Sequence, residues 1–355
     1  MRCAGPRIPG IRRLLVVRTD RLGDFVLTLP AIRVLRCAYP DVWLGALVSP
    51  GIAPLARTAE DVDEVLVAPP SIAGLSAVMV AFRPDVALFV SRSPREPMAA
   101  WRAGLPNRVG SGYRWYSPWL HRRVDERRRA GRRHEAEFAL SFAHRVGGQS
   151  AEAEFPIALP KAVREAADAW IAMQRVGRRF VIVHPGSGGS CPNWPVSHWV
   201  ELTALLEGQG IRVAFSIGPG DREVERALDR EHMRIRRLPR FRGSVVPLAG
   251  LLARAAVVVG ASTGPLHLAA ALGTPTLMLQ VPWPTCGPSR WGPYSERGWS
   301  LVADLPEARR WTRTARALHG ERLLAGIPTV EAARCVEAMV EGRSPLRDPL
   351  SRSTA

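Results

Sequence analysis

The residues best suited to binding an anion lie in the sequence AAVVVGASTGPLHLAAAL, from Ala255 to Leu272. The run Val257–Val259 is apolar and β-branched, which predicts a strand buried on both faces. Gly260 ends that run, and small residues then allow a tight turn before Pro265, which suits the first turn of a helix. Unpaired backbone N–H groups and the helix dipole attract negative charge at such a start. We therefore predict a nucleotide-binding half-domain that holds a diphosphate here.

Polar side chains in the same turn could contribute to that site. Ser262 and Thr263 precede the expected helix, and His267 lies in its first turn and could reach the same ligand. The alternatives are structural: Ser262 and Thr263 could cap the helix, and His267 could be a buried histidine under the sheet. From Arg254 to Arg290, His267 is the one side chain between the ends that can carry a charge.

A carboxylate follows the first expected strand, Leu14–Arg18. Asp24 ends the turn TDRLGD, and a helix is expected over Phe25–Cys37, in which Pro30 is an awkward early residue. A carboxylate in a loop at the mouth of a cleft could take the proton from an attacking hydroxyl group. The alternative is that Asp24 caps the helix, and composition alone favours the cap.

Strands and helices alternate along the chain. This rhythm predicts an α/β protein with two doubly wound, Rossmann-like parallel-sheet domains facing a central cleft, where ligands bind at the carboxyl ends of the strands. The basic, aromatic segment 115–133 interrupts the rhythm, and residues 149–160 form a plausible linker. The predicted organisation is an N-terminal domain over 1–155, a C-terminal domain over 156–328, a helix over 329–342 that could pack back on the N-terminal domain, and a flexible tail over 343–355.

Composition favours an anionic partner, and it predicts that any association with a membrane is peripheral. The 49 Lys and Arg residues exceed the 32 Asp and Glu residues, for a formal charge of +17. Such a charge suits a nucleic acid, an acidic membrane or a phosphorylated glycolipid, although a solvated basic surface is the structural alternative for any one cluster. The five cysteines lack metal-ligand spacing and suit reduced thiols of a cytoplasmic protein, and neither a signal peptide nor a transmembrane helix is expected.

Four segments, in order along both halves, resemble the lipopolysaccharide heptosyltransferases, which are glycosyltransferase family 9 and have the GT-B fold. They are RTDRLGDFVLTLPAIRVLR (18–36), HPGSGG with NWP (184–195), VVGASTGPLHLAAALGTP (258–275) and PSRWGPY (288–294). The resemblance implies sugar transfer with inversion from a nucleotide sugar, typically ADP-heptose, without a metal or other cofactor. It also implies a lipid A–core saccharide as the acceptor, a cytoplasmic location and peripheral association with the inner membrane.

The resemblance also implies roles for particular residues. Asp24 matches the family's catalytic acid and would act as the general base. Asp221 lies in the turn matching the one near the donor's ribose, although a solvated acid at a helix start is the alternative. The positions matched to donor binding are Gly23, Gly186, Ser187, Gly188, Asp221, Ser262, Thr263, Gly264, Pro265 and His267.

Two positions depart from the family pattern. The family commonly has a lysine near Pro192 that contacts the donor diphosphate, and this chain has none there; Ser262 stands where Asp is frequent. A diphosphate favours at least one full positive charge, which Arg18 or Arg290 could supply. We predict Arg290, because it lies in the same half as both phosphate loops; the alternative is that Arg290 stacks structurally on a tryptophan.

Other function classes fit less well. A nicotinamide-dependent oxidoreductase needs G-x-G-x-x-G at a first strand–helix turn, and neither TDRLGD nor HPGSGGSCP has it. No helix-turn-helix, zinc or RRM signature supports nucleic-acid binding. A glycosyltransferase using another nucleotide sugar, a sugar-nucleotide epimerase of the GT-B architecture, or an inactive glycan-binding paralogue stay open as alternatives.

Overall fold

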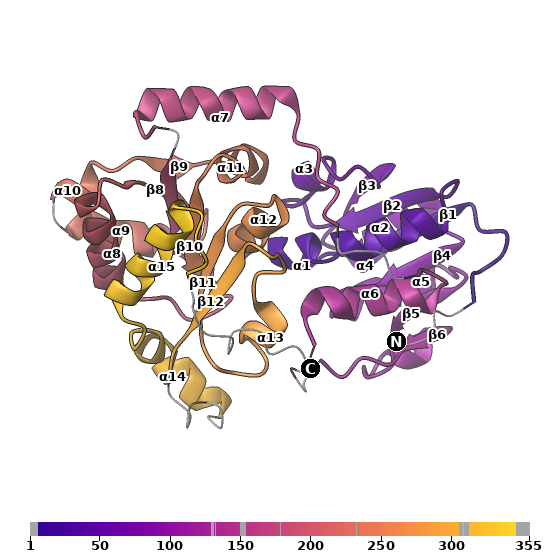
Figure 1. Ribbon diagram of the computed structural model, residues 1–355. Coiled ribbons are helices and arrows are strands. Elements are labelled where there is room, and N and C mark those ends of the chain that lie inside the picture. Colours follow the sequence, from indigo (N-terminus) through magenta and orange to yellow (C-terminus); the bar gives the residue numbers. More distant parts are fainter. Residues whose placement is uncertain are drawn as a thin grey trace. The chain divides into compact units, whose positions relative to one another are not determined.

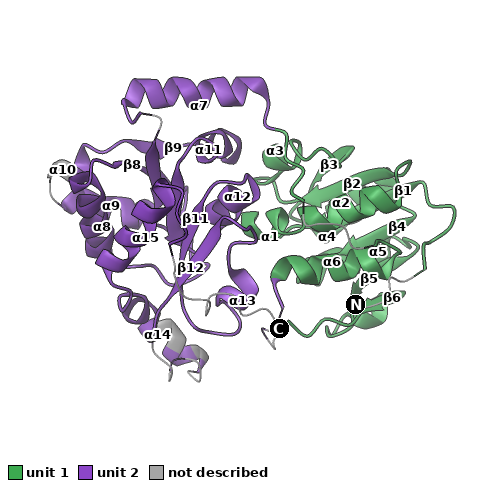
Figure 2. Ribbon diagram, viewed as in Figure 1, with its two compact units in different colours: residues 1–128, 135–158 green, residues 129–134, 159–355 purple. Residues whose placement is uncertain are grey.

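The structure of the 355-residue chain is a computed structural model that describes residues 6–128, 131, 133–149, 154–177, 179–231, 233–304, 308 and 312–345. The chain forms two compact units: unit 1 contains residues 1–128 and 135–158, and unit 2 contains residues 129–134 and 159–355 (Figure 2). The predicted boundary after residue 155 lies close to the crossing after residue 158. Nothing in the sequence signals that residues 129–134 join unit 2. The predicted flexible tail lies outside the described residues from 346 onward.

Unit 1 contains a six-stranded parallel sheet in the order β3-β2-β1-β4-β5-β6 (Figure 1). Because β1 pairs with β2 on one side and β4 on the other, the winding reverses between β1 and β4, and this is where doubly wound sheets bind ligands. The strands are β1 (Arg13–Arg18), β2 (Trp43–Val48), β3 (Glu64–Val67), β4 (Val86–Phe89), β5 (Arg108–Ser111) and β6 (Arg122–Val124).

Unit 2 repeats this topology with the order β12-β11-β10-β7-β8-β9. Here the winding reverses between β7 and β10, where Gly260 is in register with His184. The two predicted phosphate loops therefore leave the sheet side by side, after neighbouring strands. The strands are β7 (Phe180–His184), β8 (Arg212–Ile217), β9 (Arg240–Arg242), β10 (Val257–Ala261), β11 (Thr276–Gln280) and β12 (Gly298–Val302).

Helices connect the parallel strands and cover the sheets. Those of unit 1 are α1 (Leu22–Val26), α2 (Leu29–Ala38), α3 (Ala53–Ala56), α4 (Ile72–Phe82), α5 (Arg95–Arg102), the 3₁₀ turn η1 (Ser117–Trp119) and α6 (Glu135–Arg145). Those of unit 2 are α7 (Lys161–Gln174), α8 (Val196–Gly208), α9 (Arg222–Arg230), α10 (Met233–Arg236), α11 (Val245–Leu252), α12 (Gly264–Ala271), α13 (Pro288–Trp291), α14 (Arg313–Leu324) and α15 (Thr329–Val340).

The helix expected over Phe25–Cys37 is two helices, so the prediction of one continuous helix is wrong. α1 ends at Val26, and α2 begins at Leu29 with Pro30 in its first turn. Proline lacks the N–H that a continuing helix needs but suits a helix start, which explains the break. The consequence is that Asp24 lies in a helix of little more than one turn, directly after β1.

Each unit has its own apolar core, and α15 belongs to that of unit 2. In unit 1, Leu15 and Val17 of β1 pack with residues of α4 and α5. The sequence predicts that the 329–342 helix could pack back on the N-terminal domain. In the structure Ala332, Val336 and Met339 are instead buried in the unit 2 core, where α15 packs on α8. Periodicity identifies the apolar face of a helix, whereas the partner of that face is set by the tertiary fold.

Candidate functional site

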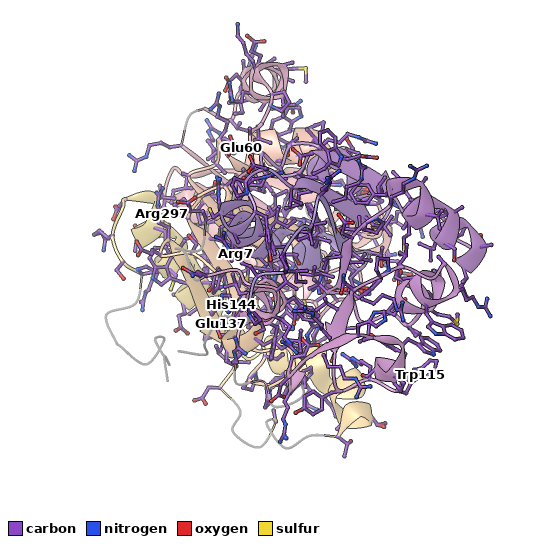
Figure 3. The ribbon with its side chains drawn as sticks, turned by 90° about the vertical axis from the view of Figure 1, so that its right-hand side faces the viewer. Arg7, Glu60, Trp115, Glu137, His144 and Arg297 are labelled. Carbon is purple, nitrogen blue, oxygen red and sulfur yellow. The ribbon has the colours of Figure 1, made fainter. Side chains whose placement is uncertain are left out.

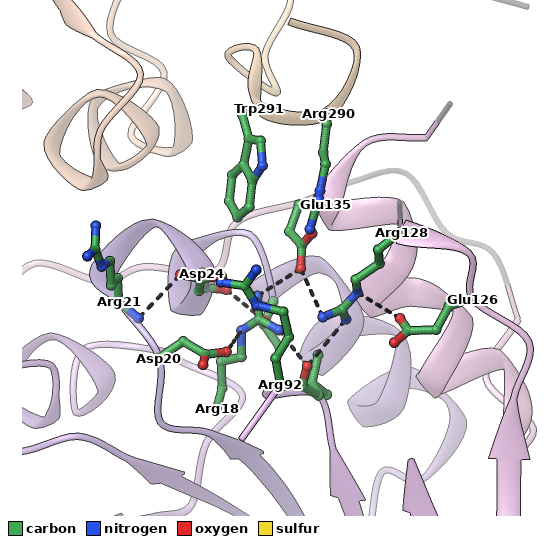
Figure 4. A network of polar contacts seen from close by, with 12 residues as sticks. Arg18, Asp20, Arg21, Asp24, Arg92, Glu126, Arg128, Glu135, Arg290 and Trp291 are labelled. Carbon is green, nitrogen blue, oxygen red and sulfur yellow. Dashed lines mark hydrogen bonds and ion pairs between the residues drawn. The ribbon is translucent and has the colours of Figure 1, made fainter. Parts of the chain in front are cut away.

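The centre of the candidate site in unit 1 is a pair formed by Arg18 and Asp24 (Figure 4). Arg18 ends β1, and its side chain is 1% exposed. Its Nη2 donates a 2.7 Å hydrogen bond to Asp24 Oδ1, and its Nη1 donates a 2.7 Å bond to the carbonyl oxygen of Val90 after β4. The pair therefore lies at the point where the winding of the unit 1 sheet reverses, and the guanidinium links the chain after β1 to the chain after β4.

Asp24 is the third residue of α1, and its side chain helps to cap the N-terminus of that helix. Its Oδ2 accepts a 3.3 Å hydrogen bond from the backbone N–H of Arg21, which holds the N-cap position. Asp24 is thus part of a capping box and not the N-cap itself, which corrects the structural alternative drawn from the sequence. The residue is 6% exposed, and each carboxylate oxygen has a donor that fixes its direction. Gly23 is buried beside it in α1.

Further buried charges surround this pair, and sequence reasoning missed them. Glu135 at the start of α6 accepts a 3.0 Å hydrogen bond from Arg18 Nη2, and its Oε1 lies 3.5 Å from Arg128 Nη1. Arg128 also forms a 2.8 Å ion pair with Glu126, and Asp20 lies 3.5 Å from Arg18 Nε. All five side chains are drawn in Figure 4. Two arginines therefore share four carboxylates within this cluster, and the partners come from segments far apart in the sequence.

Burial and pairing act in opposite directions on the pKa values of this cluster. Burial raises the pKa of Asp20 above its ordinary value, with Arg18 opposing the rise, and it raises the pKa of Glu126, with Arg128 opposing. Burial alone would lower the pKa of Arg18, but Asp24, Asp20 and Glu135 outweigh it, so the pKa rises. Arg18 is therefore a permanent cation whose charge is already engaged by carboxylates.

The arginines of the basic run at residues 122–133 do not share one environment. Arg122 begins strand β6, and Arg128 is buried in the cluster of Figure 4. Arg123 and Arg127 are exposed, while residues 129, 130 and 132 lie outside the described residues. The described arginines of the run therefore range from buried to exposed positions. Side chains of β6 alternate between the two faces of the sheet, and Arg128 is drawn inward by its ion pairs with Glu126 and Glu135.

In unit 2, Asp221 ties together the two loops that follow β7 and β8. Its Oδ1 accepts a 3.3 Å hydrogen bond from the N–H of Gly188, and its Oδ2 accepts a 3.0 Å bond from the N–H of Gly218. Asp221 is buried, so it is not the solvated acid that the sequence offered as the alternative. Both oxygens of its carboxylate accept hydrogen bonds from backbone groups, so Asp221 shapes the loop.

The loop after β7 needs glycine where it approaches Asp221. A Cβ on Gly186 would lie 2.0 Å from Asp221 Cγ, and Gly188 has a φ of +52°. Ser187 stabilises the turn from within, because its hydroxyl group donates to the carbonyl oxygen of Cys191 at 2.8 Å. Next to this loop, burial lowers the pKa of His184, with Asp221 opposing, and His184 Nδ1 lies 2.9 Å from Ser216 Oγ.

The start of α12 offers polar groups in the second predicted phosphate loop. Thr263 is the N-cap, yet its side chain makes no capping hydrogen bond, and its buried Oγ1 has no hydrogen-bond partner among the described residues. The backbone N–H groups of Gly264 and of the residues after Pro265 begin the helix, and His267 is buried in its first turn. A buried hydroxyl without a partner at a helix N-terminus suits an anionic ligand.

Hydrogen bonds connect the three segments of unit 2 that the sequence predicts to bind the nucleotide sugar. Cys191 Sγ donates to the carbonyl oxygen of Ser262 at 3.2 Å, and the Ser262 hydroxyl group donates to the backbone carbonyl oxygen of Trp291 at 2.8 Å. The loop after β7, the start of α12 and the PSRWGPY segment are therefore held together. Arg290 in that segment is buried, its guanidinium carbon lies 5.3 Å from the Trp291 ring centroid, and its Nη1 donates to Thr285 at 3.4 Å.

The described residues contain no group of three or more His, Cys, Asp or Glu side chains arranged to hold a metal ion. Within the same part of the chain, every helix is too short or too polar to span a bilayer.

Comparison with known proteins gives one consistent family. Residues 98–319 match the family model of glycosyltransferase family 9 (heptosyltransferase). A putative glycosyltransferase of Haemophilus influenzae is 26% identical over 302 residues, which cover 81% of this chain and 87% of that protein. Lipopolysaccharide heptosyltransferase 1 of Escherichia coli is 26% identical over 294 residues, which cover 76% of this chain and 88% of that protein.

Solved structures share the fold. A family 9 glycosyltransferase from Veillonella parvula superposes with a TM-score of 0.80 at 19% identity, covering 93% of this chain and 98% of that one. The ADP-heptose lipopolysaccharide heptosyltransferase II of Escherichia coli gives 0.75 at 19% identity, covering 93% and 99%. These likenesses confirm the predicted GT-B fold, and the family match spans more than half of the chain. The chain therefore belongs to glycosyltransferase family 9, the heptosyltransferase family.

Proposed function

We propose that this protein transfers a heptose from ADP-heptose to a hydroxyl group of a lipopolysaccharide-core saccharide, with inversion at the anomeric carbon. One observation carries the proposal: in a chain of this family, Asp24 presents a buried carboxylate at the carboxyl end of β1, fixed by Arg18 at 2.7 Å. The names of similar proteins support the choice of donor and acceptor. One relative is a lipopolysaccharide heptosyltransferase, and another solved structure of the fold holds ADP-2-deoxy-2-fluoro heptose.

In the proposed reaction Asp24 is the general base. The acceptor oxygen attacks the anomeric carbon, its proton passes to an oxygen of Asp24, and the bond from that carbon to the diphosphate breaks with the electron pair leaving on ADP. Attack from the side opposite the leaving group inverts the configuration. Arg18 fixes one oxygen of Asp24 and the Arg21 N–H fixes the other, so the base needs little rearrangement before reaction.

We propose that unit 2 holds the donor diphosphate. The N-terminus of α12 and the hydroxyl group of Thr263 supply donors on one side, and the backbone of Gly186–Gly189 supplies them on the other. Ser262 and Asp221 act indirectly, by holding Trp291 and the Gly188 loop. Charge on the departing ADP is then spread over fixed dipoles and a cation.

The cation in this scheme is Arg290. Arg18, the other candidate, is buried among Asp24, Asp20 and Glu135, so we assign it to positioning the base and not to the donor. Arg290 lies in the segment that Ser262 joins to the start of α12. Its stacking on Trp291, which the sequence offered as the structural alternative, also fixes the direction of the guanidinium.

The acceptor proposed here is attached to a lipid, so the protein would work at the cytoplasmic face of the inner membrane as a peripheral protein. The formal charge of +17 supports attraction to an anionic surface and to the phosphates of a glycolipid.

The test is release of ADP from ADP-heptose in the presence of lipopolysaccharide from a heptose-deficient strain, with mass spectrometry of the glycan. The account predicts addition of one heptose, in a reaction that survives EDTA. A thermal-shift screen against ADP-, GDP-, UDP- and dTDP-sugars identifies the donor, because a ligand at about 100 times its Kd raises the free energy of unfolding by roughly 2.7 kcal/mol. Selective stabilisation by another nucleotide sugar, with no ADP release, would refute ADP-heptose as the donor.

A further inference from the structure

Unit 1 exposes a cluster of aromatic side chains that the proposed reaction does not use. We define the aromatic patch as Trp101, Tyr113, Trp115 and Trp119. The rings of Trp101 and Trp119 stack with centroids 5.7 Å apart, and Trp115 meets Trp119 edge-on at 5.3 Å. Trp115 is 73% exposed, Trp101 is 49% exposed and Tyr113 is 48% exposed (Trp115 is labelled in Figure 3). Exposed indoles that contact one another mark a surface at which a protein, membrane or ligand binds.

Within residues 92–127, the segment that contains the aromatic patch, the exposed charges are positive with one exception. Arg102 follows Trp101 and is exposed. Arg123 Nε donates a 3.2 Å hydrogen bond to the carbonyl oxygen of Ser117 in η1, and Arg127 Nε donates a 3.0 Å bond to the Tyr113 hydroxyl group. Between residues 92 and 127, all of which the structure describes, Asp125 is the single exposed acid. Aromatic and cationic groups are thus interleaved on one surface.

We propose that the aromatic patch, with Arg102, Arg123 and Arg127, docks the protein on an anionic bilayer surface. Tryptophan and tyrosine favour the bilayer interface, because an apolar ring and a polar N–H or O–H group meet there. Arginines beside them attract anionic headgroups. The inference rests on the proposed function in one respect, that a lipid-linked acceptor would be reached at such a surface.

The same surface fits a bilayer better than a saccharide. Small ligands such as saccharides bind in concave sites, where a few precisely placed polar groups fix their orientation. Asp125 is the exposed carboxylate of the surface, and it already accepts a hydrogen bond from the Tyr113 hydroxyl group. Trp115 and Trp119 meet at an interplanar angle of 73°, so these two rings form no flat platform for a sugar ring. Exposed indoles beside arginines instead suit the headgroup region of an anionic bilayer.

The experiment is co-sedimentation of the full chain with vesicles of phosphatidylethanolamine and phosphatidylglycerol, compared with vesicles of phosphatidylcholine alone. The wild-type protein should bind the anionic vesicles and lose binding as salt rises. Trp115→Ala should weaken binding about tenfold, because an indole no longer enters the interface. The triple variant Arg102→Gln/Arg123→Gln/Arg127→Gln should weaken it by about fivefold for each charge removed.

Two matched controls separate this surface from net charge and from a general loss of tryptophan. Trp43→Ala removes an indole that is 45% exposed on β2, away from the β5–β6 edge of the sheet. Arg12→Gln/Arg57→Gln/Arg83→Gln removes three exposed charges that precede β1, β3 and β4. Both controls should bind vesicles nearly as the wild type does, and thermal melting should show that every variant is folded.

Several results would overturn the inference. One is equal loss of vesicle binding in the two arginine triples, which would mean that net charge alone acts. Another is wild-type binding in Trp115→Ala. A third is a patch variant that keeps vesicle binding but loses binding to a lipid-free core oligosaccharide, which would assign the patch to the glycan. Vesicle binding is measured without donor or acceptor, so its failure is distinct from failure of the proposed transfer reaction.

Discussion

At the scale of single residues, the proposed chemistry depends on a largely buried carboxylate that is held in a fixed direction. That direction is set by a neighbouring cation on one oxygen and by the backbone N–H of Arg21 on the other. Arg18 supplies that cation at 2.7 Å, and Glu135 and Val90 hold the guanidinium in place at 3.0 and 2.7 Å. Glu135 touches no reacting atom in this scheme; it is a positioning residue that acts through Arg18.

The positioning role of Glu135 predicts a kinetic effect without a binding effect. Glu135→Gln keeps the shape of the side chain but removes the charge that holds Arg18, so Arg18 and Asp24 should shift. We expect kcat to fall roughly ten- to a hundredfold while KM for the donor stays within about twofold. The control is Glu137→Gln, the same change two residues along α6. Equal loss in both variants, or a change confined to KM, would contradict the role.

The assignment of Arg290 to the donor diphosphate predicts that ADP binds more weakly when its charge is removed. Arg290→Ala removes the cation assigned to the diphosphate, and we expect Kd for ADP to rise roughly ten- to a hundredfold, since hydrogen bonds to charged groups contribute about 1.5–3 kcal/mol. Arg290→Lys should restore part of the affinity because it restores the charge. The control Arg297→Ala removes an exposed arginine of the same unit. Isothermal titration that finds wild-type affinity in Arg290→Ala would show that backbone dipoles suffice.

At the scale of elements, the sequence predicts the strand, turn and helix around Gly260 well and the charge cluster of unit 1 poorly. The run Val257–Val259, the break at Gly260 and Pro265 in the following helix are local signals, and β10 and α12 form as predicted. The partnership of Arg18 with Glu135 joins residues 117 positions apart. A buried arginine and an exposed one carry the same local signal, so nothing in the basic run distinguishes Arg128 from Arg127.

The loop after β7 gives a prediction at this scale. Gly186→Ala would place a methyl group 2.0 Å from Asp221 Cγ, so the loop or Asp221 must move. We expect the free energy of unfolding to fall by about 1–3 kcal/mol and donor binding to weaken, because the hydrogen bonds from Gly188 and Gly218 depend on Asp221. Chemical denaturation and titration with ADP measure the two effects.

A matched control for this loop is Gly208→Ala. Gly208 ends α8, and a Cβ there would meet no atom within 4 Å, so the substitution should leave stability unchanged or slightly higher. If Gly186→Ala behaves in the same way as this control, the close approach of Asp221 is not a constraint on the loop.

At the scale of the whole molecule, the two units share one sheet topology, although we propose different roles for them. Each sheet reverses its winding next to its first strand, and the residues proposed to act lie there: Asp24 after β1 in unit 1, and the loops after β7 and β10 in unit 2. Alternating strands and helices were enough to predict this doubly wound architecture. The assignment of residues 129–134 to unit 2 could not be predicted, because it depends on tertiary contacts such as Ser289 Oγ to the carbonyl oxygen of Gly131 at 2.8 Å.

The division of labour between units yields the most direct test, the turnover of Asp24→Asn with saturating donor and acceptor. The substitution preserves size and leaves one oxygen to accept from Arg18, but it removes the base and the acceptor for the Arg21 N–H, while the donor-binding groups proposed in unit 2 are untouched. The account predicts that kcat falls about a hundredfold or more, with Kd for ADP and the melting temperature close to those of the wild type. Turnover within a few-fold of the wild-type rate, under conditions where chemistry limits the rate, would contradict the assignment of Asp24 as the general base.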